Sequence, residues 1–192
     1  MCNRYGYLAP VADLVEEFSQ TRVPIRWPEP GSRPNLPPLP EIRPTDSAPL
    51  VRAFEGGAQL DSVRWGFPPA PGRKSGPVIN FRSEGRRFTS GRCLIPASYF
   101  FEFTGERYPK TKWRFTKPGE PVFCIAGLWR EGADGPAFTM LTTEPGPDVA
   151  PYHDRQVAVL HKAEWADWLD PSIEAGPLLR PLPAGALEVE QA

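Results

Sequence analysis

A cluster of prolines constrains the fold of this chain more than any other feature. Nine of the 26 prolines in 192 residues lie between Val23 and Leu50. Proline lacks a backbone N–H and cannot continue a helix, so this segment is not helical and has few donors for a β-ladder. We expect residues 23–50 to form a long loop in extended or polyproline-like conformation, serving as a connector or as a covering flap.

Two other segments have the pattern of short amphipathic helices. Pro10–Thr21 carries apolar residues at i, i+3, i+4 and i+7, and proline is well suited to a first helical turn. His161–Leu169 places two tryptophans and a leucine on one side. We therefore expect helices in these two ranges, each with one buried face.

From Gln59 onward, short segments rich in Val, Ile, Phe, Trp and Thr alternate with Gly and Pro, which favours β-strands. The expected strands are residues 60–67, 77–83, 92–103, 110–116, 121–130, 137–143 and 156–161. The strands at 121–130 and 137–143 are expected to pair as a hairpin. The chain is thus predicted to be α+β, with one β-rich domain at residues 1–170 and an irregular tail at 171–192.

Composition excludes several classes of protein. No run of 18 apolar residues occurs, and the first residues lack the apolar stretch of a secretory signal, so we expect neither a membrane span nor export. Three scattered cysteines and two histidines do not suit a disulfide scaffold or a zinc cage. We expect a cytoplasmic monomer without metal or cofactor.

The net charge of −1 hides an uneven distribution. Residues 73–92 carry six basic residues against one acid, and residues 164–192 carry six acids against one arginine. Local clusters of Lys and Arg, rather than the total charge, decide affinity for nucleic acid. The basic stretch is therefore either part of a surface for a polyanion or simply a solvated face.

Cys2 is the residue whose reactivity the sequence indicates most clearly. Its small side chain permits removal of Met1, which would give one residue both a free α-amine and a thiol. The reference pKa is roughly 7.7 to 8.0 for an α-amine and roughly 8.5 for a cysteine thiol, so at neutral pH a usable fraction of each group is in its nucleophilic form. A 1,2-aminothiol captures an aldehyde as an imine and then closes a thiazolidine ring, or it transfers an acyl group. Otherwise Cys2 is merely the second residue of a translated chain.

Three more residues are candidates for the same chemistry. Asn80 alternates with Phe81 in an expected strand, so its side chain faces either water or a polar cleft. Glu102 lies among phenylalanines, where desolvation would raise the pKa of its carboxyl toward values useful for proton transfer, unless it emerges at a strand edge. His153 titrates near neutrality and is either a catalytic or a structural histidine.

These residues lie in short strings that together resemble the SOS-response-associated peptidase (SRAP) family, the abasic-site processing proteins. Members of that family begin with Met-Cys-Gly-Arg, and the later strings follow in the same order from Cys2 to Leu169. The counterparts in this chain are Met1–Arg4, Arg64–Gly66, Asn80–Glu84, Arg92–Ala97, Phe101–Phe103, Ala126–Trp129, Thr142–Thr143 and His153–Val157. Each string alone is weak, but their common order makes the resemblance specific.

The resemblance implies a β-rich SRAP fold, with mixed or antiparallel strands in a barrel-like core and a few peripheral helices. It implies self-removal of Met1 and a covalent thiazolidine between Cys2 and the ring-opened aldehyde of an abasic site in single-stranded DNA. Some members also cleave the abasic strand as lyases. The roles it implies are Cys2 as nucleophile, Asn80 for positioning, Glu102 for proton transfer and His153 for opening the sugar ring and for release.

The same resemblance implies a set of DNA contacts. Arg4, Arg82 and Arg155 would hold phosphates, and Trp65 would offer a flat surface to a neighbouring base. Single-stranded DNA is generally bound by cationic grooves and stacking surfaces of this kind. Bound to DNA, the protein would be associated with the nucleoid.

Two other functions fit some of the residues. In an amidohydrolase or peptidase with an N-terminal nucleophile, Cys2 would attack a carbonyl and Asn80 would donate to the oxyanion. In a non-catalytic single-strand binding module, the basic stretch and Trp65 would suffice. Stable attachment to abasic DNA that depends on Cys2 would distinguish covalent capture of abasic sites from both of these functions.

Overall fold

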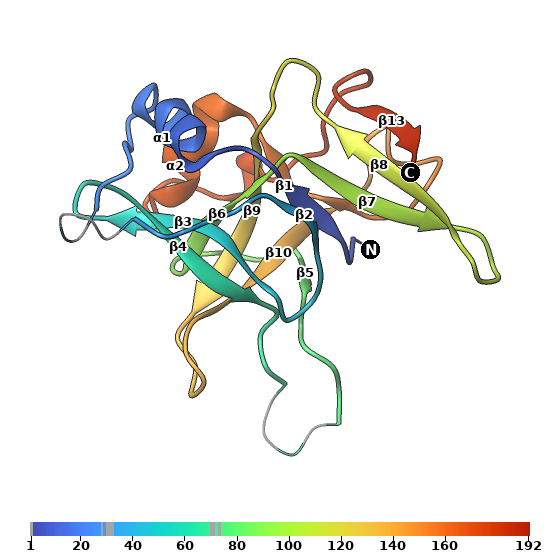
Figure 1. Cartoon of the computed structure of the whole chain (residues 1–192), viewed down its shortest axis with the longest axis horizontal. Coiled ribbons are helices and arrows are strands. Elements are labelled where there is room, and N and C mark those ends of the chain that lie inside the picture. Colours follow the sequence, from blue (N-terminus) through green and yellow to red (C-terminus); the bar gives the residue numbers. More distant parts are fainter. Residues whose placement is uncertain (1, 28, 30–32, 70–71, 73) are drawn as a thin grey trace.

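Two β-sheets and a few short helices make up the fold (Figure 1). The computed structural model describes residues 2–27, 29, 33–69, 72 and 74–192. The elements in these residues are β1 (Tyr5–Tyr7), α1 (Val11–Ser19), β2 (Leu39–Ile42), β3 (Ser47–Phe54), β4 (Gly57–Trp65), β5 (Asn80–Arg82), β6 (Arg92–Ala97), β7 (Tyr99–Thr104), β8 (Thr111–Thr116), β9 (Phe123–Arg130), β10 (Ala137–Thr143), β11 (Gln156–Val157), β12 (Val159–Leu160), α2 (Trp165–Leu169) and β13 (Glu188–Gln191). Short 3₁₀ turns occupy Lys162–Glu164 and Gly176–Leu178.

The larger sheet closes on itself. Its strands follow the order β11-β10-β4-β3-β6-β9-β12, and β9 also pairs with β10, which completes a ring of hydrogen-bonded strands. β10 runs parallel to β4 and antiparallel to β9. The expected barrel-like core of mixed strands is therefore confirmed, as is the hairpin of β9 and β10.

The smaller sheet has the order β13-β8-β7-β1-β2, so the first strand of the chain lies between two others. Tyr5 and Tyr7 in β1 are fully buried. The expected strand at 92–103 is divided between the two sheets, because β6 belongs to the barrel and β7 to the smaller sheet. This division brings β1, and Cys2 three residues ahead of its first residue, alongside the barrel.

Both expected helices are present. α1 buries Leu14 and Phe18, and the Phe18 ring packs 4.8 Å from the ring of Trp165 at the start of α2. Figure 1 shows the two helices side by side at one end of the molecule, away from the N-terminus. None of the helices in the described residues is long and apolar enough to cross a membrane.

The expectation of a continuous loop at 23–50 is wrong in part, because β2 and the first half of β3 lie in it. Both strands tolerate their prolines for positional reasons. β2, with Pro40, is an edge strand, where a missing N–H costs no ladder bond. Pro49 pairs with β4, but β6 reaches β3 only at Val51 and Arg52, so proline has one neighbouring strand.

The expectation of an irregular tail from residue 171 is also wrong. β13 pairs antiparallel with β8 over four residues and forms an edge of the smaller sheet. Leu178, Leu182 and Leu187 are buried and belong to the core. Leucines spaced among prolines therefore anchor this segment, although its sequence lacks a regular apolar period.

Candidate active site

Strand pairing fixes the position of Cys2. β1 pairs with β7 through Tyr5 and Gly6, and the backbone N–H of Phe101 donates to the carbonyl of Arg4 at 3.0 Å. Cys2, three residues ahead of Tyr5, is only 1% exposed, and its thiol donates to the Arg4 carbonyl at 3.1 Å. The cysteine is thus held by the sheet rather than carried on a loose end.

Asn80 reaches Cys2 from the barrel. β5 pairs with the second half of β10, where Asn80 lies opposite Met140. The Asn80 side-chain nitrogen donates to the main-chain carbonyl of Cys2 at 2.7 Å. The side chain therefore faces a polar site and not open water. This was one of the two alternatives that the sequence pattern left open for Asn80.

Glu102 supplies a carboxyl group to the same place. It lies on β7 and is 1% exposed. Burial raises the pKa of this carboxyl to about 7, and the charge of Asp154 acts in the same direction, whereas a hydrogen bond from the Cys2 backbone N–H favours the carboxylate. The carboxyl therefore exchanges protons near neutral pH, which suits an acid–base group.

Burial has a different effect on the thiol. It raises the pKa of Cys2 to about 12, with the neighbouring Glu102 charge contributing in the same direction. The expectation of a usable thiolate fraction at neutral pH is therefore wrong for this conformation. A neutral thiol is a poor first nucleophile, so the order of any bond-forming steps matters.

His153 lies on the loop that follows β10. Its Nδ1 accepts the backbone N–H of Arg155 at 2.9 Å and lies 2.8 Å from an Asp154 carboxylate oxygen. Partial burial lowers the pKa of His153 below its ordinary value. The lowered pKa favours the neutral ring. The two contacts make opposite demands on Nδ1, because the Arg155 N–H needs a lone pair there whereas the Asp154 carboxylate favours a proton there.

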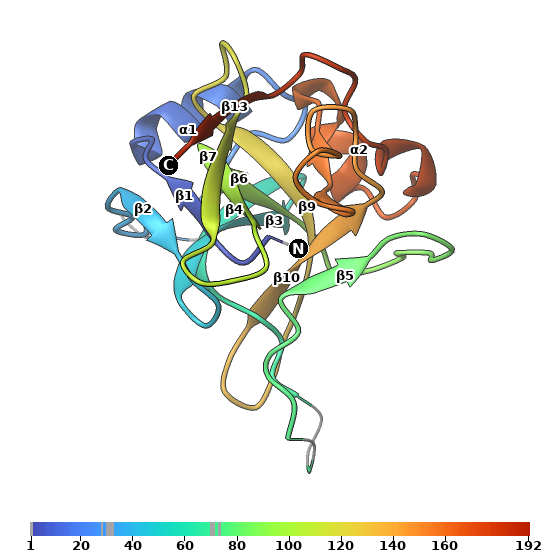
Figure 2. The ribbon, with the colours of Figure 1, turned by 90° about the vertical axis from the view of Figure 1, so that its right-hand side faces the viewer.

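An open pocket of about 310 Å³ adjoins these groups. Its lining residues are Asn3, Arg4, Glu102, Phe103, Tyr108, Lys110 and His153. In Figure 2 the N-terminus lies between the β7–β8 hairpin and β5. The structure thus brings together the four residues predicted for catalysis, although only Glu102 and His153 of these line the pocket itself.

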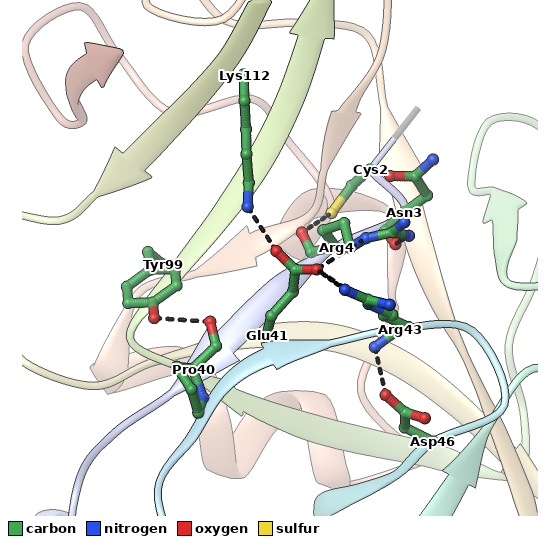
Figure 3. A network of polar contacts seen from close by, with 9 residues as sticks. All are labelled: Cys2, Asn3, Arg4, Pro40, Glu41, Arg43, Asp46, Tyr99 and Lys112. Atoms are coloured by element: carbon green, nitrogen blue, oxygen red, sulfur yellow. Dashed lines mark hydrogen bonds and ion pairs between the residues drawn. The ribbon is translucent and has the colours of Figure 1, made fainter. Parts of the chain in front are cut away.

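Arg4 belongs to a charged network around Glu41 (Figure 3). The Glu41 carboxylate contacts Arg4 at 3.3 Å, Arg43 at 2.7 Å and Lys112 at 2.5 Å. Lys112 and then Arg43 lower the pKa of Glu41 to about 2 against the opposing effect of burial. The three cations outnumber the carboxylates of Glu41 and of Asp46, which accepts the backbone N–H of Arg43, so the network carries a small excess of positive charge, which favours an anionic ligand.

The two remaining arginines have different surroundings. Arg82 is exposed at the end of β5, and within the described residues it makes no ion pair. Arg155 is engaged: it contacts both carboxylate oxygens of Glu84, at 2.5 and 2.9 Å, and donates to the carbonyl of Thr142 at 2.8 Å. Arg155 therefore secures the His153 loop to β10 and to Glu84, two residues after β5, and its expected role in holding phosphate is not supported.

Trp65 does not offer a surface to a base. Its side chain is fully buried, its indole nitrogen donates to the carbonyl of Ile79 at 3.0 Å, and its ring packs edge-on against Tyr5 at 5.2 Å. The expected stacking role is thus wrong. The sequence shows that an aromatic residue ends this strand, but not which side of the barrel wall it occupies.

The basic stretch at 73–92 is only partly a surface feature, and Arg73 lies outside the described residues. Arg92 is 6% exposed, and its guanidinium donates to the carbonyls of Phe88, Asp170 and Ile173. It fastens the segment after α2 to the barrel. Arg86 lies over the ring of Phe81 at 4.4 Å and remains exposed.

Sequence reasoning missed Glu41, Lys110, Lys112 and Tyr108. The first was hidden inside the proline-rich segment, and the others lie on β8 or on the loop before it. A glycine and a proline in residues 105–110 are the signal of a turn, whose side chains are exposed. Among the described residues, no group of three or more His, Cys, Asp and Glu side chains is placed to hold a metal ion.

Comparison with protein families gives a match over residues 1–192 to the model of the SOS response associated peptidase (SRAP) family. The chain belongs to this family. Its SRAP relatives include a protein of Bacillus subtilis (strain 168) named abasic site processing protein YoqW, 28% identical over 189 residues that cover 89% of this chain and 81% of the relative. Another, YoaM of the same organism, is 25% identical and covers 89% and 80%.

Solved structures confirm the SRAP fold. A protein from Bacteroides thetaiotaomicron superimposes with a TM-score of 0.77 at 18% identity, covering 99% of this chain and 91% of the other. A protein from Bordetella bronchiseptica gives 0.76 at 22% identity, covering 100% and 99%. At these identities the similarity concerns the fold.

Proposed function

We propose that this SRAP protein captures abasic sites in single-stranded DNA as a covalent thiazolidine on Cys2. Its relatives YoqW and YoaM bear the name abasic site processing protein. One observation carries the proposal: the Cys2 backbone nitrogen, which becomes an α-amine when Met1 is removed, donates to the buried carboxyl of Glu102. Met1 itself lies outside the described residues.

The chemistry requires proton transfer at each step. The α-amine adds to the C1′ aldehyde of the opened sugar, and loss of water from the adduct gives an imine. The neutral thiol then adds to the imine carbon, so that an S–C bond forms and the thiol proton ends on nitrogen. Glu102, with a pKa of about 7, protonates the departing hydroxyl and accepts a proton from the amine.

The raised pKa of the thiol supports this order. At a pKa of about 12 the thiol stays protonated until the imine is available as an electrophile. The same pKa opposes a peptidase that starts with thiolate attack on an amide carbonyl. It therefore favours aldehyde capture over hydrolysis of external peptides.

Asn80 and His153 complete the proposed mechanism. Asn80 fixes the carbonyl of Cys2 and so orients the amine. His153, which lines the pocket, exchanges a proton with the ring oxygen of the closed sugar and so speeds its opening to the scarce aldehyde. In the reverse direction, the same contact assists release. In members that act as lyases, elimination from the imine competes with thiol addition.

Arg4, Arg82 and Lys110 are proposed to contact phosphates, since two of them line the pocket and the third is exposed on β5. The affinity of the protein for DNA, before any adduct forms, should therefore fall as the salt concentration rises. A thiazolidine already formed should survive the same salt. We propose single-stranded DNA as the ligand, because the abasic sugar has to enter the pocket and a strand without a paired partner can present it there.

Intact mass before and after incubation with an abasic single-stranded oligonucleotide tests the proposal. The expected result is a protein lacking Met1 that gains the mass of the oligonucleotide minus one water. Cys2→Ala should give no stable adduct, although borohydride should still trap its imine. Absence of an adduct from protein whose Met1 is removed contradicts the proposal.

We further propose that the chain removes its own Met1, using Glu102. In that case Glu102→Gln, expressed in the same cells, retains Met1 while the wild-type protein and Arg82→Ala lose it. Complete removal from all three would instead assign the step to the host's aminopeptidase.

A further inference from the structure

Tyr108 is the most exposed large hydrophobic side chain in the described part of the chain. It is 90% exposed, whereas the next, Leu8, is 43% exposed. It lies in the loop between β7 and β8, which projects beyond the N-terminus in Figure 1. Single exposed apolar residues are common, so exposure alone does not indicate a function.

The surroundings of Tyr108 make its exposure significant. It lines the same pocket as Glu102 and His153, and Lys110 and Arg4 line that pocket as well. An aromatic ring with two cations beside the reacting groups has the composition of a single-strand binding surface.

Other aromatic residues near Cys2 are less available. Trp65 is buried, and the ring of Phe101 is covered by the Lys112 ammonium at 3.9 Å. Tyr99 is 7% exposed and packs against Phe101 at 5.2 Å. Phe103, the other aromatic residue that lines the pocket, is half-buried, so the fully exposed ring at this pocket is that of Tyr108.

We propose that Tyr108 stacks on the nucleobase next to the abasic nucleotide and that Lys110 contacts the adjoining phosphate. This inference rests on the proposed function. The abasic nucleotide has no base of its own, so only its neighbours can stack. In a single strand these neighbours have free faces, whereas in a duplex they are already stacked and paired.

The test measures binding to a stable tetrahydrofuran analogue, which has no aldehyde and forms no adduct. One oligonucleotide carries adenine on both sides of the analogue, and the other carries further analogues there instead. Tyr108→Ala should weaken binding to the first by roughly 5- to 150-fold, the range expected for loss of one base–aromatic stack. Binding to the second should change by less than about twofold.

Two variants serve as controls. Tyr108→Phe keeps the ring and should bind both oligonucleotides as the wild type does. Leu8→Ala removes an exposed apolar side chain outside the pocket lining and should also have no effect. Equal weakening on both oligonucleotides, or none on either, overturns the stacking inference.

The outcome is distinguishable from failure of the proposed function. Adduct formation with a natural abasic site, without any base-dependent effect of Tyr108→Ala, overturns only the stacking inference. A base-dependent loss of binding with no adduct from the wild-type protein overturns only covalent capture.

Discussion

The side-chain amide of Asn80 donates to the main-chain carbonyl of Cys2 over 2.7 Å, joining residues 78 positions apart in the chain. This bond connects the barrel, through β5, to the residue ahead of the first strand of the smaller sheet. The orientation of Cys2 thus depends on how the two sheets pack together.

Asn80→Ala tests this connection. The Cys2 carbonyl loses its partner, and we expect a loss of about 1–3 kcal/mol in the free energy of unfolding. Adduct formation should slow by about 10- to 100-fold, since a small displacement of the amine is costly. Single-turnover kinetics on an abasic oligonucleotide and chemical denaturation measure the two effects. Asn80→Asp, which keeps the shape but cannot donate, should be equally slow, and a fast Asp variant would contradict the role of the bond.

Glu102→Gln should change how stability depends on pH. The native carboxyl has a pKa of about 7 and an unfolded one about 4.3, so between these values the native state holds more protons than the unfolded state. Stability of the wild type therefore falls as pH rises through this window, by roughly 4 kcal/mol, and this contribution is constant above pH 7.

The glutamine variant lacks this titration, so its free energy of unfolding relative to wild type should rise between pH 4.5 and 7. Denaturant unfolding at pH 4.5, 6 and 8 measures the difference. Glu106→Gln, on the exposed hairpin loop, is the matched control and should run parallel to the wild type. Parallel curves for Glu102→Gln would show that its carboxyl has an ordinary pKa in the folded protein.

Arg82→Ala and Arg155→Ala should affect DNA binding in different ways. Loss of one phosphate contact at the exposed Arg82 should reduce the slope of log affinity against log salt by about 0.7, with stability unchanged. Arg155→Ala should keep the slope but cost about 0.5–1.5 kcal/mol of stability, because the bonds from Arg155 to Glu84 and Thr142 are lost while the Thr142 carbonyl keeps its donors from Ser83. Salt titrations and thermal unfolding distinguish them, and a reduced slope for Arg155→Ala would assign it to the DNA.

Trp65 should matter for stability and not for base contacts. Trp65→Ala should cost about 3–5 kcal/mol because it empties a fully buried site. Trp65→Phe keeps most of the volume, and folded protein of this variant should bind single-stranded DNA within about twofold of wild type. Denaturation and equilibrium binding provide the measurements; a large loss of affinity in stably folded Trp65→Phe would restore the stacking role.

Gly6→Ala should strain the junction of β1 and β7. A Cβ atom there would lie 2.2 Å from a ring carbon of Tyr99, whose hydroxyl donates to the carbonyl of Pro40 in β2. We expect destabilisation by about 1–3 kcal/mol. Combining it with Tyr99→Ala should remove the clash, so the double variant should lose less than the sum of the single losses. Strictly additive losses in this cycle would contradict the steric explanation.

The elements that the sequence predicted are those with a regular period and a uniform environment. α1 has a clear apolar face, and the barrel strands are rich in β-branched and aromatic residues. The sequence did not predict β2 and β3, because the number of prolines was taken as evidence against strands. The cost of a proline to a strand depends instead on whether a neighbouring strand needs the missing N–H. β13 was missed because its sequence, Glu-Val-Glu-Gln, is polar on an edge strand.

The site was predicted in part for similar reasons. Cys2, Asn80, Glu102 and His153 were found through ordered motifs, and the fold brings them together. Burial is a property of the assembled barrel, so the sequence did not reveal that Trp65 is enclosed. Nor did it reveal that Arg155 is already paired, since Glu84 lies 71 positions away in the chain.

The embedding of β1 between β7 and β2 limits where the nucleophile can act. Three residue steps separate Cys2 from the buried Tyr5, and an extended chain advances at most about 3.6 Å per step. Its reach is therefore about 10 Å even if the intervening residues straighten. If the protein captures abasic sites as proposed, the damaged sugar therefore has to reach the mouth of the pocket, and an aldehyde enclosed within a regular double helix stays beyond this distance.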